Sequence, residues 1–456
     1  MKSATIVGAG LVGSLWSVFL AKAGYKVTIL ERRSDLRKAD ISAGKSINLA
    51  LSKRGWTALE AAGVADEVRD IAIPMYGRTM HDLAGDLTYQ PYGQEGQAIF
   101  SVSRAGVNCR MMEIAEKYGN AEILFEKQCD HVDFDTSTVH YSDLKTGEKS
   151  TIQSDVIFAA DGAFSAVRYS SMQKQNGFNF SQHYIEDGYR EILLPANPDG
   201  SYKMEKERLH IWPRGRFMLI ALPNEDGSFT CTLFMPKTGH NYAFDKLTSK
   251  EAVNQFFEEV FPDFYAMMPE VGETWEDYPL AGLVITRCFP WSYGKTCLMG
   301  DAAHATVPFY GQGMNGGFED CRIMNELMLK HEEDWEQVFK AFEVLRKPDG
   351  DGLQDLSLHN YYVMRDYVAD PEFLLQKKFE LRISKLYPNK YLPLYSQVSF
   401  SNVRYSVAYE AGMNQDAFIK DIMKEHDVAG LFESGGIDEL IHSIFKEKPV
   451  LELELN

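Results

Sequence analysis

The stretch that decides the fold is Gly8-Ala9-Gly10-Leu11-Val12-Gly13, which follows an apolar run at 4–7 and opens a helix-like pattern to about residue 23. A second apolar run at 25–31 completes the pattern, which predicts a β-α-β unit. In such a unit the first glycine permits the tight turn, the second lets a pyrophosphate approach the backbone, and the third allows the helix to pack on the strand. The free N–H groups and the dipole of the helix start attract the anion.

The residue that completes a dinucleotide site is Glu31, which lies 18 positions beyond Gly13 (31 − 13), at the end of the second predicted strand. A carboxylate at that place accepts hydrogen bonds from the ribose hydroxyls of an adenosine. Glycine-rich turns alone are common, but here the strand, the helix and the acidic residue occur in order. The unit therefore predicts an adenine dinucleotide, although it does not separate FAD from NAD.

Two further motifs lie near residues 160 and 300. The apolar strand predicted over 155–160 ends in Asp161-Gly162, and Ser165, Val167 and Arg168 follow it. The second motif runs Gly300-Asp301-Ala302-Ala303-His304 and continues through Pro308 to Gly311-Gln312-Gly313-Met314-Asn315. Taken singly, these motifs also fit a polar turn and an ordinary helix cap, and His304 fits a packed structural role as well as a functional one.

Together the three motifs resemble those of the single-component FAD-dependent aromatic hydroxylases. In that superfamily the D-G-x-x-S-x-V-R element lies where FAD and NAD(P)H meet, and the aspartate of the G-D segment binds the ribityl chain of FAD. The resemblance implies a mixed α/β fold like that of p-hydroxybenzoate hydroxylase. It implies that FAD is held by Gly8, Gly10, Leu11, Val12, Gly13, Glu31, Arg32, Leu49, Arg104, Asp161, Gly162, Gly300, Asp301, Pro308, Gly313, Met314 and Asn315.

The domain organisation that we expect has three parts. A discontinuous Rossmann-like FAD-binding domain covers 1–73, 104–175 and 276–345, and it is interrupted by a substrate-binding sheet domain over 74–103 and 176–275. A C-terminal helical region covers 346–456. Helices are expected over 55–70, 104–118 and 249–261, and strands over most of 122–160 and 176–240.

Four other stretches are similar to the kynurenine 3-monooxygenase family: 44–52, 101–104, 210–214 and 307–311. The resemblance covers residues 4 to about 410. It implies that NADPH and O2 are used to hydroxylate L-kynurenine to 3-hydroxykynurenine through a flavin C4a-hydroperoxide, in tryptophan catabolism by the kynurenine pathway, which leads to NAD biosynthesis. The flavin would supply the chemistry, so neither a catalytic side chain nor a metal is expected.

The same resemblance implies the substrate pocket. Arg78 would bind the α-carboxylate, because a guanidinium binds a carboxylate in a bidentate fashion. Tyr92, Tyr395 and Asn360 would lie at the amino-acid end. The apolar walls would be Met218, Ile220, Leu222 and Phe234, together with Pro308 and Phe309. The first three are spaced by two and so face one side of a strand, which an ordinary core strand would show as well.

Composition excludes several other classes. The formal net charge of −18 argues against a nucleic-acid partner. The six cysteines form no C-x-x-C pair, which is typical of reduced thiols in a cytoplasmic protein. There is no run of about 18 apolar residues, and the chain ends in a polar, acidic segment where some relatives carry a hydrophobic anchor, so no membrane contact is expected. The sequence leaves open whether the protein forms a homodimer.

Three alternatives remain at this point. Hydroxylation of another aromatic acid, such as an anthranilate or a salicylate, would keep every FAD motif and change only the pocket. A flavin halogenase is disfavoured because the W-x-W-x-I-P element is absent. A redox-sensing flavoprotein that binds a partner is disfavoured because no interaction module or long charged tail is added.

Overall fold

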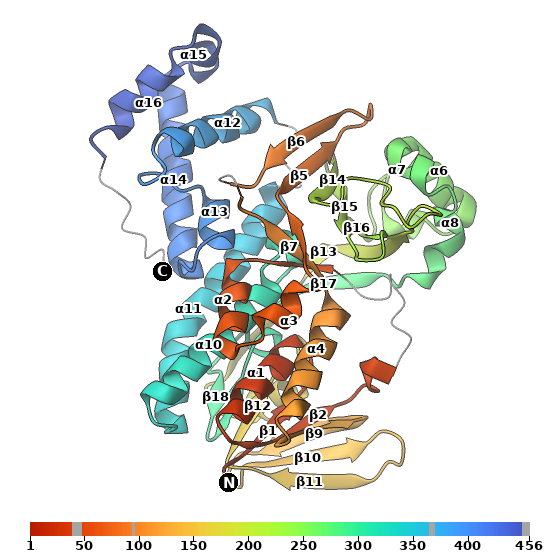
Figure 1. The fold of residues 1–456 in the computed structure, drawn as a ribbon, viewed down its shortest axis with the longest axis vertical. Coiled ribbons are helices and arrows are strands. Elements are labelled where there is room, and N and C mark those ends of the chain that lie inside the picture. The colour runs from red at the N-terminus through yellow and green to blue at the C-terminus, as the bar shows by residue number, and fades with distance from the viewer. Residues whose placement is uncertain (39–47, 94–95, 364–369, 449–456) are drawn as a thin grey trace.

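The computed structural model describes residues 1–38, 48–93, 96–363 and 370–448, and it combines two large sheets, each with helices beside it, with a group of helices at the C-terminal end (Figure 1). The first sheet has the strand order β18-β19-β12-β1-β2-β8. All neighbours in it are parallel except β18 and β19. Its strands are β1 (Ser3–Val7), β2 (Lys26–Glu31), β8 (Ala121–Phe125), β12 (Val156–Ala159), β18 (Ser292–Tyr293) and β19 (Thr296–Leu298).

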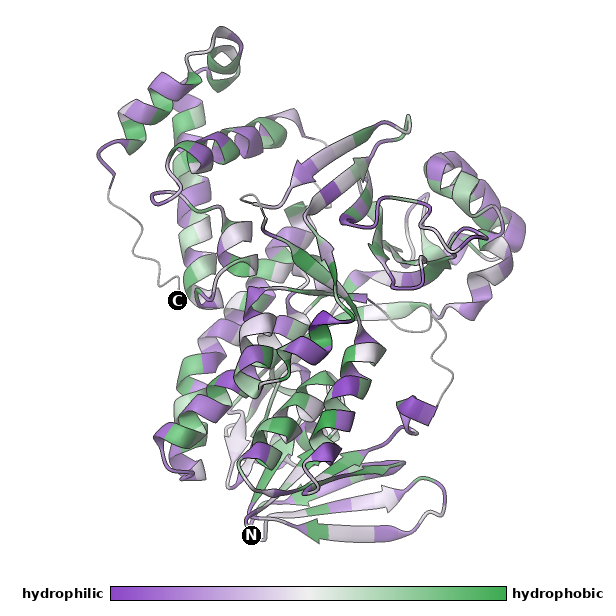
Figure 2. Cartoon of the chain, viewed as in Figure 1, coloured by the Kyte–Doolittle hydropathy of each residue, from purple (hydrophilic) through white to green (hydrophobic). Residues whose placement is uncertain are grey.

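This parallel sheet forms because its strands are apolar on both faces, which is typical of a sheet covered on each side. Ile6, Val27 and Phe158 are fully buried in it. Helix α1 (Leu11–Lys22) packs on the sheet, and hydrophobic residues gather on α1 and the strands around it (Figure 2). The helix ends before Gly24, whose φ of +82° lets the chain turn back into β2. The predicted β-α-β unit is confirmed.

The second large sheet has seven strands in the order β17-β13-β16-β15-β14-β5-β6. They are β5 (Gly77–His81), β6 (Leu87–Pro91), β13 (Asn179–Leu194), β14 (Arg208–Arg214), β15 (Phe217–Pro223), β16 (Phe229–Pro236) and β17 (Ala281–Phe289). Two small sheets complete the strands. One joins β3 (Asn48–Leu51), β7 (Ile99–Ser103) and β4 (Ile73–Met75), and the other joins β11 (Lys149–Gln153), β10 (Thr138–Asp143) and β9 (Lys127–Asp133).

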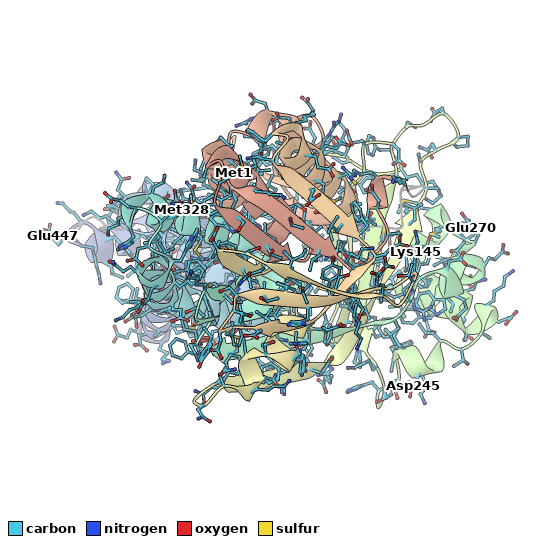
Figure 3. All side chains as sticks on the ribbon, turned by 90° about the horizontal axis from the view of Figure 1, so that it is seen from below. Met1, Lys145, Asp245, Glu270, Met328 and Glu447 are labelled. Atoms are coloured by element: carbon cyan, nitrogen blue, oxygen red, sulfur yellow. The ribbon has the colours of Figure 1, made fainter. Side chains whose placement is uncertain are left out.

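The helices lie mainly beside the first sheet and in the C-terminal part of the chain. The earlier ones are α2 (Lys53–Ala62), α3 (Ala65–Arg69), α4 (Arg104–Lys117), α5 (Ala166–Ser170), α6 (Lys250–Val260), α7 (Pro262–Met267), α8 (Val271–Thr274) and α9 (Asp301–His304). The later ones are α10 (Gly313–Lys330), α11 (Trp335–Tyr362), α12 (Pro371–Leu386), α13 (Leu394–Ser399), α14 (Tyr405–Glu425), α15 (Val428–Ser434) and α16 (Ile437–Phe445). Seen from below, Glu447 after α16 lies on the opposite side from Lys145 in the β10–β11 turn and Glu270 before α8 (Figure 3).

Several boundaries differ from those predicted. The helix expected over 55–70 is two helices, because Gly63 takes a left-handed φ of +71° and ends α2. The sequence assigns 276–345 to the FAD-binding part, but β17 pairs with β13 in the second large sheet. It places 74–103 with that sheet, yet β4 and β7 pair with β3 instead. The boundary expected at 345 falls inside α11. The division into three domains otherwise stays a prediction.

Candidate active site

The three glycine-containing motifs meet at one edge of the first sheet. Strands β1, β12 and β19 are neighbours, and their carboxyl ends lead directly into Gly8, Asp161 and Gly300. Backbone hydrogen bonds continue the pairing to this edge: Ala160 N donates to Val7 O at 2.8 Å, and Met299 N donates to Ala159 O at 2.9 Å. In open α/β sheets, ligands bind at the carboxyl ends of the strands.

The glycines of the first motif fit a pyrophosphate. A Cβ on Gly8 (φ +100°) would lie 2.6 Å from Ala160 O, and a Cβ on Gly13 would lie 2.0 Å from Gly8 O. These two glycines are therefore required by close backbone contacts within the protein. A Cβ on Gly10 would meet no atom within 4 Å. Gly10 thus borders open space at the start of α1, where the N–H groups of the first turn have no partner within the helix.

Glu31 lies where the adenosine ribose is expected, but its carboxylate already has protein partners. Its Oε2 accepts from Ala9 N at 2.9 Å, and its Oε1 accepts from both Arg33 N and Arg33 Nε at 2.9 Å. Burial opposes ionisation, yet the hydrogen bonds from Arg33 and Ala9 lower the pKa of Glu31 overall, so the acid is a carboxylate. Arg33, which the sequence analysis did not single out, holds this carboxylate although its own side chain is 49% exposed, and the predicted Arg32 is exposed as well.

Asp161 and Arg168 connect the second motif to the third. Asp161 Oδ2 accepts from Ala166 N at 2.7 Å, while Oδ1 is buried without a hydrogen-bond partner among the described residues. Burial raises the pKa of Asp161. The fully buried Arg168 donates to Ala302 O at 2.6 Å and to Ala163 O, and so holds the turn at Gly162 against α9. A buried polar atom without a partner is the feature expected where a ligand atom binds.

The third motif leaves one carboxylate free for a ligand. Asp301 begins α9, is exposed, and makes no hydrogen bond or ion pair within the part of the chain that the structure describes. Val12 packs against the motif: a Cβ on Gly300 would lie 2.8 Å from Val12 Cγ2, and one on Gly317 would lie 2.6 Å from it. The first and third motifs are therefore in direct contact, and Asp301 lies at the edge where they meet.

Of the remaining residues expected to hold FAD, some already contact the protein and others border open space or solvent. Leu49 and Met314 are in the apolar core around the motifs, and Gly313 has no atom closer than 3.8 Å to an added Cβ. Asn315 uses its side chain on the protein, because Oδ1 accepts from Ser52 N at 2.9 Å and Nδ2 donates to Ala50 O at 2.9 Å. Arg104 is exposed at the start of α4.

His304 has a structural partner. Its Nε2 lies 2.6 Å from Asp320 Oδ2, which also accepts from Gly300 N at 3.0 Å. Burial opposes protonation, but the charge of Asp320 raises the pKa of His304 overall. The same carboxylate therefore holds both ends of the single turn that carries Asp301. These contacts favour a structural role for His304, which the sequence had left open beside a functional one.

Two of the residues expected at the amino-acid end of the substrate, Tyr92 and Tyr395, form a cage around Arg78. Its Cζ lies 5.2 Å from the centre of the Tyr92 ring and 5.0 Å from that of Tyr395. Those two rings stack at 5.3 Å, and Tyr310, which the sequence did not single out, stacks on Tyr395 at 5.9 Å. Burial raises the pKa of all three phenols. Among the described residues, no carboxylate lies within 4.0 Å of Arg78, so its charge lacks a counter-ion there.

Three of the six residues expected as pocket walls, Met218, Ile220 and Leu222, share one face of β15. Met218 belongs to an apolar cluster with Phe234 and Phe309, and Leu222 belongs to another with Tyr92. Ile220 packs against both clusters. The alternate residues of this strand pack into a separate core on the other face. The alternation predicted from the sequence therefore holds, and it leads from the Phe309 cluster to the cage around Arg78.

The segment after the third motif joins these parts. Pro308 is exposed and Phe309 is buried, and Asn360 Nδ2 donates to Phe309 O at 2.6 Å. Asn360 therefore contacts the backbone of Phe309, one of the residues predicted as a pocket wall. Residues 44–47 of the stretch 44–52 lie outside the described residues. Across the described ranges, the helices include none that is both long and apolar enough to cross a bilayer.

Comparison with known proteins identifies the class. Residues 1–335 match the family model described as FAD binding domain. One similar solved structure is 2-methyl-3-hydroxypyridine-5-carboxylic acid oxygenase (TM-score 0.67, 20% identity, 82% of this chain and 95% of that chain). Another is Pseudomonas aeruginosa PqsL (TM-score 0.65, 17% identity, 80% and 97%). The chain thus has an FAD-binding domain and the p-hydroxybenzoate hydroxylase-like fold of FAD-dependent monooxygenases.

Proteins related in sequence are more similar to this chain than these two solved structures are. Proteins named kynurenine 3-monooxygenase match from Flavobacterium johnsoniae (45% identity over 443 residues, 97% of this chain and 98% of the relative) and Myxococcus xanthus (44% over 420 residues, 92% and 90%). A third, from Dictyostelium discoideum, is 38% identical over 440 residues (93% and 94%). The chain belongs to the kynurenine 3-monooxygenase family and is a flavin monooxygenase of the kynurenine pathway.

Proposed function

We propose that this protein uses NADPH and O2 to hydroxylate L-kynurenine to 3-hydroxykynurenine. The observation that carries the proposal is the cage around Arg78. A guanidinium without a counter-ion, beside the stacked rings of Tyr92 and Tyr395, suits the α-carboxylate of an aromatic amino acid. The names of the relatives, which all refer to kynurenine, support the same substrate.

The residues of the pocket would bind and orient the substrate. Arg78 would pair with the carboxylate, and the neutral phenols beside it would donate hydrogen bonds to that group. The face of β15 that carries Met218, Ile220 and Leu222 would pack along the aromatic ring and exclude water from it. The ring's own amino group donates electrons to the neighbouring carbon, so the pocket needs no nucleophile of its own.

FAD, when bound, would supply the exchange of electrons with NADPH and O2. Gly10 and the start of α1 would hold its pyrophosphate, Glu31 its adenosine ribose, and Asp301 its ribityl chain. The backbone N–H groups at Gly313 and Met314 would face the flavin ring at the start of α10, where the helix dipole favours negative charge. The motifs reach the pocket through the segment of Pro308 and Phe309, which belongs to both predicted sites.

We also place the protein in the cytoplasm. All six cysteines are free thiols, and five of them are buried, which suits a reducing compartment.

The test is NADPH oxidation by the purified FAD-loaded protein, measured with and without L-kynurenine, while the product is followed by mass. The proposal expects stimulated oxidation and a product heavier than L-kynurenine by one oxygen atom. Anthranilate and salicylate serve as comparison substrates, because both lack the amino-acid end that Arg78 would bind. Faster oxidation and a hydroxylated product with either acid, but not with L-kynurenine, would overturn the substrate assignment.

A further inference from the structure

A group of buried charges lies between the FAD motifs and the cage around Arg78. Its members are Arg54 on α2, Glu319 and Asp320 on α10, and Arg346 and Asp349 on α11, and we name it the buried charge network. The five side chains are between 0% and 4% exposed. The sequence analysis did not single out any of them, and the proposed function uses none of them.

One end of the network holds the loop that carries Asp301. Asp320 accepts from Gly300 N and from His304, as described above, and its other oxygen, Oδ1, accepts from Arg346 Nε at 2.8 Å. Arg346 Nη2 also donates to Gly316 O at 3.2 Å, in the first turns of α10. The position of Asp301 therefore depends on Asp320, and the position of Asp320 depends on Arg346.

The other end holds the segment that follows Tyr395. Arg54 Nη1 donates to Glu319 Oε1 at 3.0 Å, and its other nitrogens donate to Val398 O, at 3.3 Å, and to Val403 O. Val398 lies on α13, three residues after Tyr395. Arg54 thus ties the helix that carries Tyr395 to the helix that begins beside the flavin motifs.

A second connection runs through Asp349. Arg346 Nη1 binds both Glu319 Oε2, at 2.7 Å, and Asp349 Oδ2, at 3.2 Å. Asp349 in turn accepts from Arg404 Nε at 3.0 Å, from Ser406 Oγ at 2.7 Å and from Ser406 N at 3.2 Å, at the start of α14. With Arg404 included, three guanidinium groups face three carboxylates, and two further cationic groups flank them: Arg322 lies 3.7 Å from Glu319, and His304 lies 2.6 Å from Asp320.

We propose that the buried charge network couples the FAD site to the site of the substrate carboxylate, with Arg54 and Arg346 as positioning residues. Leaving one charge of a buried pair without its partner costs about 3–5 kcal/mol, so the members shift together or not at all. A ligand that orders one end therefore lowers the cost of ordering the other end. Couplings between two sites are typically about 5- to 150-fold in affinity. The choice of L-kynurenine as second ligand rests on the proposed function.

The first measurement is the affinity of the apo-protein for FAD, from flavin fluorescence, with and without saturating L-kynurenine and without NADPH. In the wild type, L-kynurenine should tighten FAD binding by about 5-fold or more. R54K and R404Q should bring this factor close to 1. Arg404 is 43% exposed, so R404Q is expected to fold. R382Q is the matched control, because it removes the ion pair of Arg382 with Asp438 on the outer helices and leaves the network intact.

The second measurement needs no substrate. Hydrogen–deuterium exchange of residues 394–406 should slow when FAD binds to the wild type and to R382Q, and the change should be lost in R54K and R404Q. If FAD slows this exchange but L-kynurenine does not bind, the coupling stands and the proposed substrate fails. The coupling is overturned if FAD leaves the exchange of 394–406 unchanged, or if the folded R54K and R404Q variants keep the wild-type change.

Discussion

Gly10→Ala should strongly weaken FAD binding without destabilising the protein. Gly10 has a φ of −73°, which alanine adopts readily, and its added Cβ would meet no atom within 4 Å. The free energy of unfolding of the apo-protein should therefore change by no more than about 0.5 kcal/mol. Gly13→Ala is the contrasting variant, because its Cβ would lie 2.0 Å from Gly8 O and the backbone would have to move. That variant should lose about 1–3 kcal/mol or more, with or without FAD.

The size of the effect on FAD follows from the N–H groups at the start of α1. The new methyl group would stand in the space through which the pyrophosphate approaches them. A hydrogen bond to a charged group contributes about 1.5–3 kcal/mol. Loss of two such bonds would cost about 3–6 kcal/mol, which corresponds to a dissociation constant about two to four orders of magnitude higher.

The assay is titration of the apo-proteins with FAD, followed by flavin fluorescence, together with thermal unfolding of the same apo samples. Wild type and G10A should unfold at the same temperature, whereas G13A should unfold earlier. If G10A binds FAD as tightly as the wild type, the pyrophosphate does not lie at this turn. A large loss of stability in apo G10A would show that the space beside Gly10 serves packing instead.

Three other predictions follow from the site. Arg78→Met should raise KM for L-kynurenine by about 100-fold or more, because hydrogen bonds between charged groups are lost. The flavin absorbance of the purified protein should stay unchanged, and a parallel loss of FAD would contradict the role of Arg78. Ile220→Ala should lower the free energy of unfolding by about 2 kcal/mol, at the low end for such a change because Ile220 is only partly buried, as denaturant titration would measure. His304 has a raised pKa and Asp320 one lowered to about 2, from ordinary values of 6.5 and 3.8. The free energy of unfolding of the wild type should therefore exceed that of His304→Gln by its full amount between about pH 4 and 6.5. This difference should decline as pH falls towards 2 and as pH rises through the raised pKa of His304. A difference that is the same from pH 5 to pH 9 would refute this.

Local sequence patterns determined the parts of the protein that depend on neighbours along the chain. The turn at Gly8, the helix that stops before Gly24 and the strand that ends at Glu31 follow from glycine geometry and apolar periodicity. The alternation of Met218, Ile220 and Leu222 predicted which residues of β15 share a face, because side chains alternate along any strand. The resemblance of the motifs then predicted the family.

Tertiary structure alone decided which distant residues meet. Strand β17 pairs with β13 in the second large sheet. The sequence did not predict this pairing, because β13 lies about a hundred residues earlier in the chain and no local pattern encodes such a contact. The break between the two helices over 53–69 is a local exception, because Gly63 is a glycine stop like Gly24 that the sequence analysis missed. Arg54 meets Val403, 349 residues away, and Arg346 meets Glu319 across two helices. In the sequence Arg54, Arg346 and Glu319 are ordinary charged residues, because a charge becomes part of a site only when folding removes it from water and places its partner beside it.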